Sequence, residues 1–113
     1  MNPGDVVLIP LPQIGGGPPK LRPALLLATL QGPYQNLLLC GISTQLANLQ
    51  PNWDELIQPG APDFASSRLR QTSAIRLSYL YAADPSEIAG TIGSVDPARL
   101  QRLRQRLSDH LRP

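Results

Sequence analysis

The first half of the chain is a series of short apolar runs separated by glycine and proline clusters. The first run, Val6–Ile9, is continuous rather than alternating, which is typical of a strand covered on both faces. Two further runs span residues 24–28 and 36–45, and a turn containing Gly32 and Pro33 separates them. The pattern therefore predicts three core strands in the first 45 residues.

An arginine precedes the second of these runs, and two hydroxyl residues end the third. If the two strands pair antiparallel, the entrance of one lies beside the exit of the other. We therefore expect Arg22 to lie close to Ser43 and Thr44. On composition alone, these residues are also explained simply as polar residues at strand ends.

Weaker strand signals follow in the second half of the chain. We expect a short strand at Asp54–Gln58, and a loop or half-turn at Phe64–Arg70 after a Pro-Gly cluster. Residues 72–77 alternate polar and apolar side chains, which predicts a half-exposed strand, and Tyr79–Ala82 extends it.

Two Asp-Pro pairs predict helix starts, because Asp is a good N-cap and proline is tolerated at the first helical position. We expect a short helix after Asp84 that stops at Gly93, and a longer helix from Pro97 to about His110. In the longer helix one apolar stripe is formed by leucines at three- and four-residue spacing: Leu100, Leu103, Leu107 and Leu111. The pattern as a whole predicts a mainly β fold, a small half-open barrel of five or six strands capped by a helix.

Length, cysteine content and hydropathy limit the kind of protein. The 113 residues fit one domain spanning 1–113, and the lone Cys40 cannot form an internal disulfide. The N-terminus lacks the regions of a signal peptide, and no apolar stretch approaches the ~20 residues of a membrane span. We therefore expect a soluble cytoplasmic protein without a membrane segment.

Charge is distributed unevenly along the chain. Residues 1–66 hold two basic and four acidic side chains, whereas residues 67–113 hold eight arginines and four acids. A phosphate-binding face must therefore draw on the second half of the chain together with Lys20 and Arg22. The planar guanidinium of arginine suits bidentate contact with phosphate.

Several classes of chemistry are disfavoured by residue content. One histidine and one cysteine do not make the usual zinc site, and the acids show no metal-ligand spacing, so we expect neither a metal nor a cofactor. The single histidine, His110, falls in the last turn of the predicted helix, where a capping or surface role is expected. A serine hydrolase would need Ser43, His110 and an acid to converge, and the sequence lacks a nucleophile-elbow motif.

Five short blocks, in order, carry a resemblance to a known family. They are Gly4–Val7, Leu21–Leu25, Ile42–Gln45, Ser73–Arg76 and Ile92–Gly93 followed by a terminal helix. In this order, and over nearly its whole length, the chain closely resembles the MazF/PemK family of toxin endoribonucleases. The resemblance implies an SH3-like half-open barrel of five to seven strands with a C-terminal helix. It also implies a homodimer, a cognate antitoxin, and metal-independent cleavage of single-stranded RNA through attack of the ribose 2′-hydroxyl.

The resemblance also assigns candidate residues. In the family, the arginine of the Arg-Pro block and the threonine of the block ending in glutamine form the catalytic pair. Carried over, these are Arg22 and Ser43, where serine replaces the usual threonine, and Thr44 takes this role if the register slips. This chain lacks the acidic residue that some members carry in the loop before Arg22. The candidate RNA-binding residues are Lys20, Gln45, Arg68, Arg70, Ser73 and Arg76.

Two other functions remain open on the sequence. The same barrel can serve as a non-catalytic RNA-binding or protein-binding module, since a fold does not dictate activity. A serine hydrolase using Ser43 is the other. The aromatic residues do not separate these functions, because they can stack on bases or fill the core: Tyr34, Trp53, Tyr79 and Tyr81.

Overall fold

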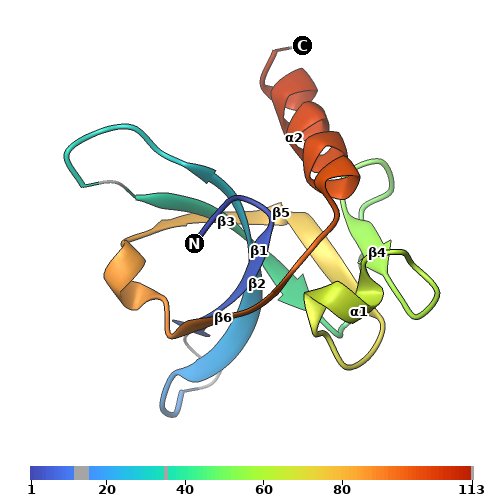
Figure 1. Ribbon diagram of the computed structural model, residues 1–113, viewed down its shortest axis with the longest axis horizontal. Coiled ribbons are helices and arrows are strands. Elements are labelled where there is room, and N and C mark those ends of the chain that lie inside the picture. The colour runs from blue at the N-terminus through green and yellow to red at the C-terminus, as the bar shows by residue number, and fades with distance from the viewer. Residues whose placement is uncertain (12–15, 35, 113) are drawn as a thin grey trace.

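The computed structural model describes residues 1–11, 16–34 and 36–112. One curled antiparallel sheet forms the body of the molecule, and a C-terminal helix rises from it (Figure 1). The elements are β1 (Asp5–Leu11), β2 (Lys20–Thr29), β3 (Leu37–Ser43), β4 (Glu55–Ile57), α1 (Phe64–Ser67), β5 (Ser73–Ala83), the 3₁₀ turn η1 (Pro85–Glu87), β6 (Gly90–Ser94) and α2 (Pro97–Leu111). The strand order is β4-β5-β3-β2-β1-β6, so the predicted mainly β half-barrel with a terminal helix is confirmed.

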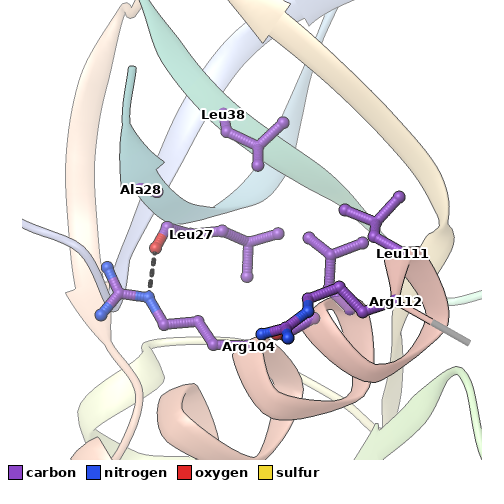
Figure 2. Close-up of a pocket in the computed structure, with 8 residues that line it drawn as sticks. Leu27, Ala28, Leu38, Arg104, Leu111 and Arg112 are labelled. Carbon is purple, nitrogen blue, oxygen red and sulfur yellow. Dashed lines mark hydrogen bonds between the residues drawn. The ribbon is translucent and has the colours of Figure 1, made fainter. Parts of the chain in front are cut away.

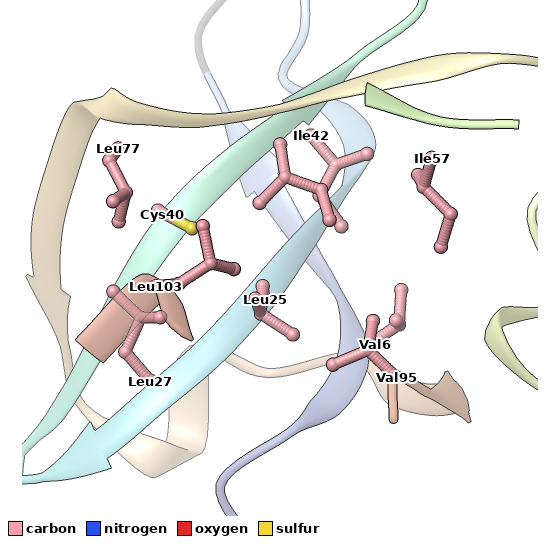
Figure 3. Close-up of a cluster of buried hydrophobic side chains, with 10 residues drawn as sticks. Val6, Leu25, Leu27, Cys40, Ile42, Ile57, Leu77, Val95 and Leu103 are labelled. Atoms are coloured by element: carbon pink, nitrogen blue, oxygen red, sulfur yellow. The ribbon is translucent and has the colours of Figure 1, made fainter. Parts of the chain in front are cut away.

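The β2–β3 hairpin lies at the centre of the sheet, and separate apolar clusters cover its two faces. On one face Leu25, Leu27 and Cys40 pack with Leu103 of α2 in what we term the inner cluster (Figure 3). On the other face lies the outer cluster, which comprises Val7, Ile9, Ala24, Leu26, Leu37, Leu39 and Ala83. Successive residues of a strand alternate between the two clusters, which explains why the apolar runs are continuous.

The prediction of a short helix after Asp84 is wrong. The Asp84 carboxylate does cap a turn, accepting a hydrogen bond from the Ser86 amide at 2.8 Å, but that turn is only η1. The chain then extends as β6 and pairs with β1 at the edge of the sheet. A helix of one or two turns has few internal hydrogen bonds, whereas β6 gains pairing with Asp5–Leu8 of β1. Gly93 also permits close approach, because a Cβ there would lie 2.4 Å from the Ser66 carbonyl oxygen.

The predicted strand at residues 72–77 exists, but it is longer and less exposed than the alternation indicated. It forms the first part of β5, in which Ser73, Ala74 and Ile75 are all buried. Strand β4 pairs with only these three residues, and β3 pairs along most of the other edge. Residues 64–70, expected as a loop or half-turn, contain the single helical turn α1.

A buried cluster of charged side chains fixes α2 to the sheet. Arg99 is 8% exposed, and its guanidinium donates to Asp63 at 2.7 Å and to Glu55 at 2.8 Å. Glu55 also accepts from Arg102 at 2.6 Å and pairs with Arg106 at 2.9 Å. We call these five residues the Glu55 network. The sequence pattern did not predict these contacts, so the network is an additional finding.

Helix α2 starts at Pro97 and ends at Leu111, close to the predicted bounds. Among residues 1–11, 16–34 and 36–112, none of the helices has the length and apolar character that crossing a membrane requires.

Candidate functional site

Arg22 lies on β2 opposite Ile9 of β1, in the exposed part of the strand. Its guanidinium makes no hydrogen bond or ion pair with any residue that the structure describes. By strand alternation Arg22 shares a face with Ala24 and Leu26, which belong to the outer cluster. The five N–H donors of this guanidinium are therefore available to a ligand at the margin of that cluster.

Ser43 is the last residue of β3 and is half-buried. The β2–β3 ladder pairs Leu25 with Cys40 and Ala24 with Gly41. If this register continues for two more residues, Ser43 lies opposite Arg22. Directly opposed residues in antiparallel strands project to the same face. Continued in this way, the register would put the Ser43 hydroxyl and the Arg22 guanidinium on one side of the hairpin.

The Ser43 hydroxyl already has one fixed partner. Its oxygen accepts a hydrogen bond from the backbone N–H of Gln45 at 3.0 Å. A hydroxyl can accept and donate at the same time, so its proton can still be donated outward. Together, a cationic fork and an oriented hydroxyl form a donor pair suited to the oxygens of a phosphate group.

Three other candidate residues lie close to this pair in sequence, and all are exposed. Lys20 begins β2 two residues before Arg22, so it projects to the same face. Thr44 follows the last residue of β3, and no hydrogen bond fixes its hydroxyl within the described chain. The backbone N–H of Gln45 donates to the Ser43 hydroxyl, and its backbone carbonyl accepts from an arginine of β5.

That arginine is Arg76, whose guanidinium is used inside the protein. One of its terminal nitrogens donates to the Gln45 carbonyl and, at 2.9 Å, to the Ala47 carbonyl. The other lies 3.5 Å from both the Asn48 carbonyl and the Asp54 carboxylate. Arg76 therefore holds the loop that follows Ser43. This role differs from the surface RNA contact expected from the sequence.

The buried side chain of Asp54 also holds this loop in place. Its side chain is fully buried, and its carboxylate accepts from the backbone and hydroxyl of Ser78 at 3.0 Å and from the Gln50 amide at 3.0 Å. This role of Asp54 was not predicted from the sequence. The residues around Asp54, such as Trp53 and Glu55, form no periodic pattern of apolar side chains. Its main hydrogen-bond partner, Ser78, lies 24 residues further along the chain on β5.

The remaining candidates are distributed over the molecule. Arg68 and Arg70 are exposed, and Arg68 follows α1 with a left-handed backbone at φ 62°. Ser73 is only 2% exposed, pairs with Ile57, and donates its hydroxyl proton to the Gln71 carbonyl at 2.9 Å. Because it is buried and internally bonded, we do not place Ser73 in the candidate site.

Other reactive side chains have structural surroundings. The His110 ring packs against Trp53 with ring centroids 4.7 Å apart. Burial, reinforced by the charge of Asp54, raises the pKa of the Cys40 thiol to about 12, so at neutral pH it is an inert core group. In the part of the chain that the structure describes, no cluster of three or more His, Cys, Asp or Glu residues could hold a metal ion.

The fold and these residues define a class of protein: a small antiparallel half-barrel with a terminal helix, in which β2 carries an exposed arginine that has no partner among the described residues and the neighbouring β3 ends in a serine. A family model described as PemK-like, MazF-like toxin of type II toxin-antitoxin system matches residues 2–111. The chain therefore belongs to this family, which confirms the resemblance carried by the five sequence blocks. Membership makes the protein a type II toxin and implies an antitoxin partner. No curated protein matches the chain.

Proposed function

We propose that this toxin is an endoribonuclease that cleaves single-stranded RNA without a metal ion. The observation that carries the proposal is the exposed Arg22, which has no partner among the described residues and lies on a strand whose pairing with β3, continued by two residues, would bring Ser43 to the same face. Family membership supports the same activity.

The reaction requires stabilisation of charge on phosphorus. The ribose 2′-oxygen attacks the adjacent phosphorus, so the O2′–P bond forms while the P–O5′ bond breaks. A proton leaves the 2′-hydroxyl and the departing 5′-oxygen gains one, which leaves a 2′,3′-cyclic phosphate and a 5′-hydroxyl. Negative charge concentrates on the non-bridging oxygens, where Arg22 and Ser43 each contribute about 2–4 kcal/mol as pre-positioned donors.

Arg22 acts in this scheme through its charge. Arginine stays protonated at every accessible pH, which makes it a poor proton acceptor but a constant electrostatic partner. The 2′-hydroxyl nucleophile is absent from DNA, so the substrate is RNA. Lys20, Arg68 and Arg70 supply exposed positive charge, and Tyr34, which is 76% exposed, offers a surface on which a base can stack.

We also propose that the toxin acts in the cytoplasm as a homodimer. Strand β4 pairs with only the first three residues of β5, and beyond them Tyr79 and Leu80 are 52% and 38% exposed. These side chains, along a strand edge that β4 does not cover, provide an apolar surface for a second copy.

The test is cleavage of single-stranded RNA by the purified protein in EDTA. We expect products ending in a 2′,3′-cyclic phosphate, and no cleavage where the attacking ribose is replaced by deoxyribose. Arg22→Ala should lower kcat by about 10²–10³-fold, and Ser43→Ala by a similar factor. Ser43→Thr keeps the hydroxyl and should retain activity, which makes it the matched control. Unfolding curves of all variants should match that of the wild type.

Two results would redirect the assignment. If the wild-type protein leaves varied single-stranded RNAs intact but shifts them in a gel, the barrel is a binding module. If a fluorophosphonate probe labels Ser43 covalently, the protein is a serine hydrolase instead.

A further inference from the structure

The buried carboxylate of Asp54 brings together donors from several segments near the candidate site. Its oxygen Oδ1 accepts from the backbone N–H and from the hydroxyl of Ser78, each at 3.0 Å. The other oxygen, Oδ2, accepts from the backbone N–H of Gln50 at 3.0 Å and lies 3.5 Å from Nη1 of Arg76. A buried carboxylate with these partners is a fixed point for the segments that carry them.

The contacts continue from Asp54 to the Ser43 hydroxyl. Arg76, the ion-pair partner of Asp54, donates through Nη2 to the Gln45 carbonyl. The backbone N–H of Gln45 donates in turn to Ser43 Oγ at 3.0 Å. We call these four residues the Asp54 network. It begins at a buried charge and ends at the hydroxyl that we place in the ribonuclease site.

Strand pairing brings the network to one face of the sheet. Ser43 pairs with Ala74 on β5, two residues before Arg76, so Ser43 and Arg76 project to the same side. On its other edge β5 pairs with β4, and Asp54 directly precedes that strand. The network therefore links β4 and β3 across the strand that lies between them.

A serine depends on such a contact more than a threonine would. Its Cβ is unbranched, so the hydroxyl can rotate among the staggered positions. Threonine carries a methyl group on the same carbon, which makes its side chain stiff at χ1. In Ser43 the hydrogen bond from the Gln45 N–H supplies the constraint, because an oxygen that accepts it is held in place while its proton can be donated outward.

We propose that Asp54 is a positioning residue that fixes the side-chain rotamer of Ser43 through Arg76 and Gln45. The inference rests on the proposed role of Ser43 as a donor to the phosphate in RNA cleavage. The Asp54 side chain is fully buried, so it acts without touching the substrate. A hydroxyl that is already oriented needs no reorganisation during the reaction. A buried charge thus gives Ser43 the constraint that a β-methyl group gives threonine.

A contact between an arginine and a carbonyl does not by itself reach Ser43. Arg104 on α2 also donates to a backbone carbonyl, that of Leu27, at 2.7 Å beside a pocket of about 410 Å³ (Figure 2). Leu27 lies near the turn of the β2–β3 hairpin, whereas Ser43 lies at its open end. Loss of the Arg104 contact therefore tests whether any disturbance of the hairpin affects Ser43.

The first experiment compares Asp54→Asn in two backgrounds, the wild type and Ser43→Thr. Asp54→Asn keeps the shape of the side chain but removes its charge and one of its two acceptor oxygens. With serine at position 43, we expect kcat for cleavage of single-stranded RNA to fall about tenfold. In the Ser43→Thr background the same substitution should lower kcat less than about twofold, because threonine restricts its own hydroxyl.

The second experiment measures the rotamer of Ser43 without RNA. Three-bond couplings of its β protons in NMR spectra report whether the side chain occupies one rotamer or several. We expect one rotamer in the wild type and averaging in Asp54→Asn. If the wild type cleaves no RNA, the ribonuclease proposal fails, and the couplings still decide whether Asp54 orients Ser43.

Two control variants remove similar contacts elsewhere. Asp63→Asn is matched to Asp54→Asn, because Asp63 is also a buried carboxylate, but its partner is Arg99 of α2. Arg104→Ala removes the contact at the turn of the hairpin. Both variants should keep the wild-type couplings of Ser43, even if Asp63→Asn lowers the melting temperature.

A milder variant covers the case in which Asp54→Asn does not fold. Ser78→Ala removes the hydroxyl contact to Asp54 but keeps the contact from its backbone N–H. It should show the same dependence on the residue at position 43, with a fall in kcat of about threefold when that residue is serine. A single Ser43 rotamer in folded Asp54→Asn, or an equal fall in kcat in both backgrounds, would overturn the inference.

Discussion

Arg99 and Arg22 have the same type of side chain but lie in opposite environments. The Arg99 guanidinium is buried and donates to Asp63, to Glu55 and to the Leu56 carbonyl. Arg22 is exposed and has no partner within the described chain. A buried arginine whose donors are all directed at protein oxygens holds elements together, whereas an exposed arginine without partners is free to bind a ligand. Burial and partners, rather than residue type, therefore separate structural from functional arginines in this molecule.

Arg76 falls between these two extremes. It is near the candidate site, as Arg22 is, but its donors are directed at backbone carbonyls of the loop after Ser43. Its exposed fraction of 16% also lies between those of the other two. We infer that Arg76 is a positioning residue, which orders the segment from Ser43 to Asn48 without contacting the phosphate.

The comparison is tested most strongly at Arg99. Arg99→Met keeps the length of the side chain but leaves Asp63 buried without its charged partner. We expect the free energy of unfolding to fall by about 3–5 kcal/mol, measured by urea denaturation. Arg22→Ala is the matched control and should change it by less than about 0.5 kcal/mol. If both substitutions changed the free energy of unfolding equally, the ion pairs of Arg99 would add no more stability than the exposed Arg22 does.

Arg76 should show a smaller effect of a different kind. Arg76→Ala releases three carbonyls, so we expect kcat for RNA cleavage to fall about tenfold while KM is unchanged. Hydrogen exchange at loop residues 44–50 should become faster whether or not the protein cleaves RNA. Arg76→Lys keeps the charge but loses the fork, so it should resemble Arg76→Ala.

A direct phosphate contact predicts a different pattern for Arg76. Lysine would then largely replace arginine, and Arg76→Ala would weaken RNA binding and reduce its salt dependence. That pattern would reassign Arg76 from a positioning residue to a ligand-binding residue.

The smallest expected effect is the pH dependence of the Glu55 network. Burial by itself disfavours ionisation of Glu55, but its hydrogen bond to Arg102 and the charges of Arg102, Arg106 and Arg99 outweigh burial and lower its pKa. Burial likewise opposes ionisation of Asp63, and the hydrogen bond from Arg99 leads the contacts that lower its pKa. Each carboxylate therefore adds stability above its ordinary pKa of about 4. That stability is lost as the pH falls through the lowered folded-state value.

The measurement is the urea midpoint from neutral pH into the acid range. The wild type should lose stability below pH ~4, and Glu55→Gln, which cannot ionise at this position, should lose less over the same interval. Parallel curves for the two proteins would mean that Glu55 does not contribute to acid sensitivity.

Local patterns anticipated much of the fold. The continuous apolar runs predicted β1, β2 and β3, because a strand buried on both faces needs apolar side chains at every position. The Asp-Pro pair and the leucine stripe predicted α2, because capping and 3.6-residue periodicity are properties of the segment itself. The same Asp-Pro signal failed at Asp84, since the decisive competitor there, pairing with the distant β1, is invisible in the local sequence.

For the candidate site, too, some features were predicted from the sequence and others were not. The antiparallel pairing of β2, which carries Arg22, with β3, which ends in Ser43, followed from the order of the runs. The burial of Ser73, the internal bonds of Arg76 and the anchoring by Asp54 did not, because each depends on partners more than 20 residues away or on which face of β5 is covered.

The sequence by itself determined the first three strands, the bounds of the last helix and the family to which the chain belongs, since each is encoded in short local patterns. Only the tertiary structure decided which arginines are structural and which are free. An arginine looks the same in sequence wherever it lies, and its role depends on the carboxylates, carbonyls and solvent that the folded chain brings to it.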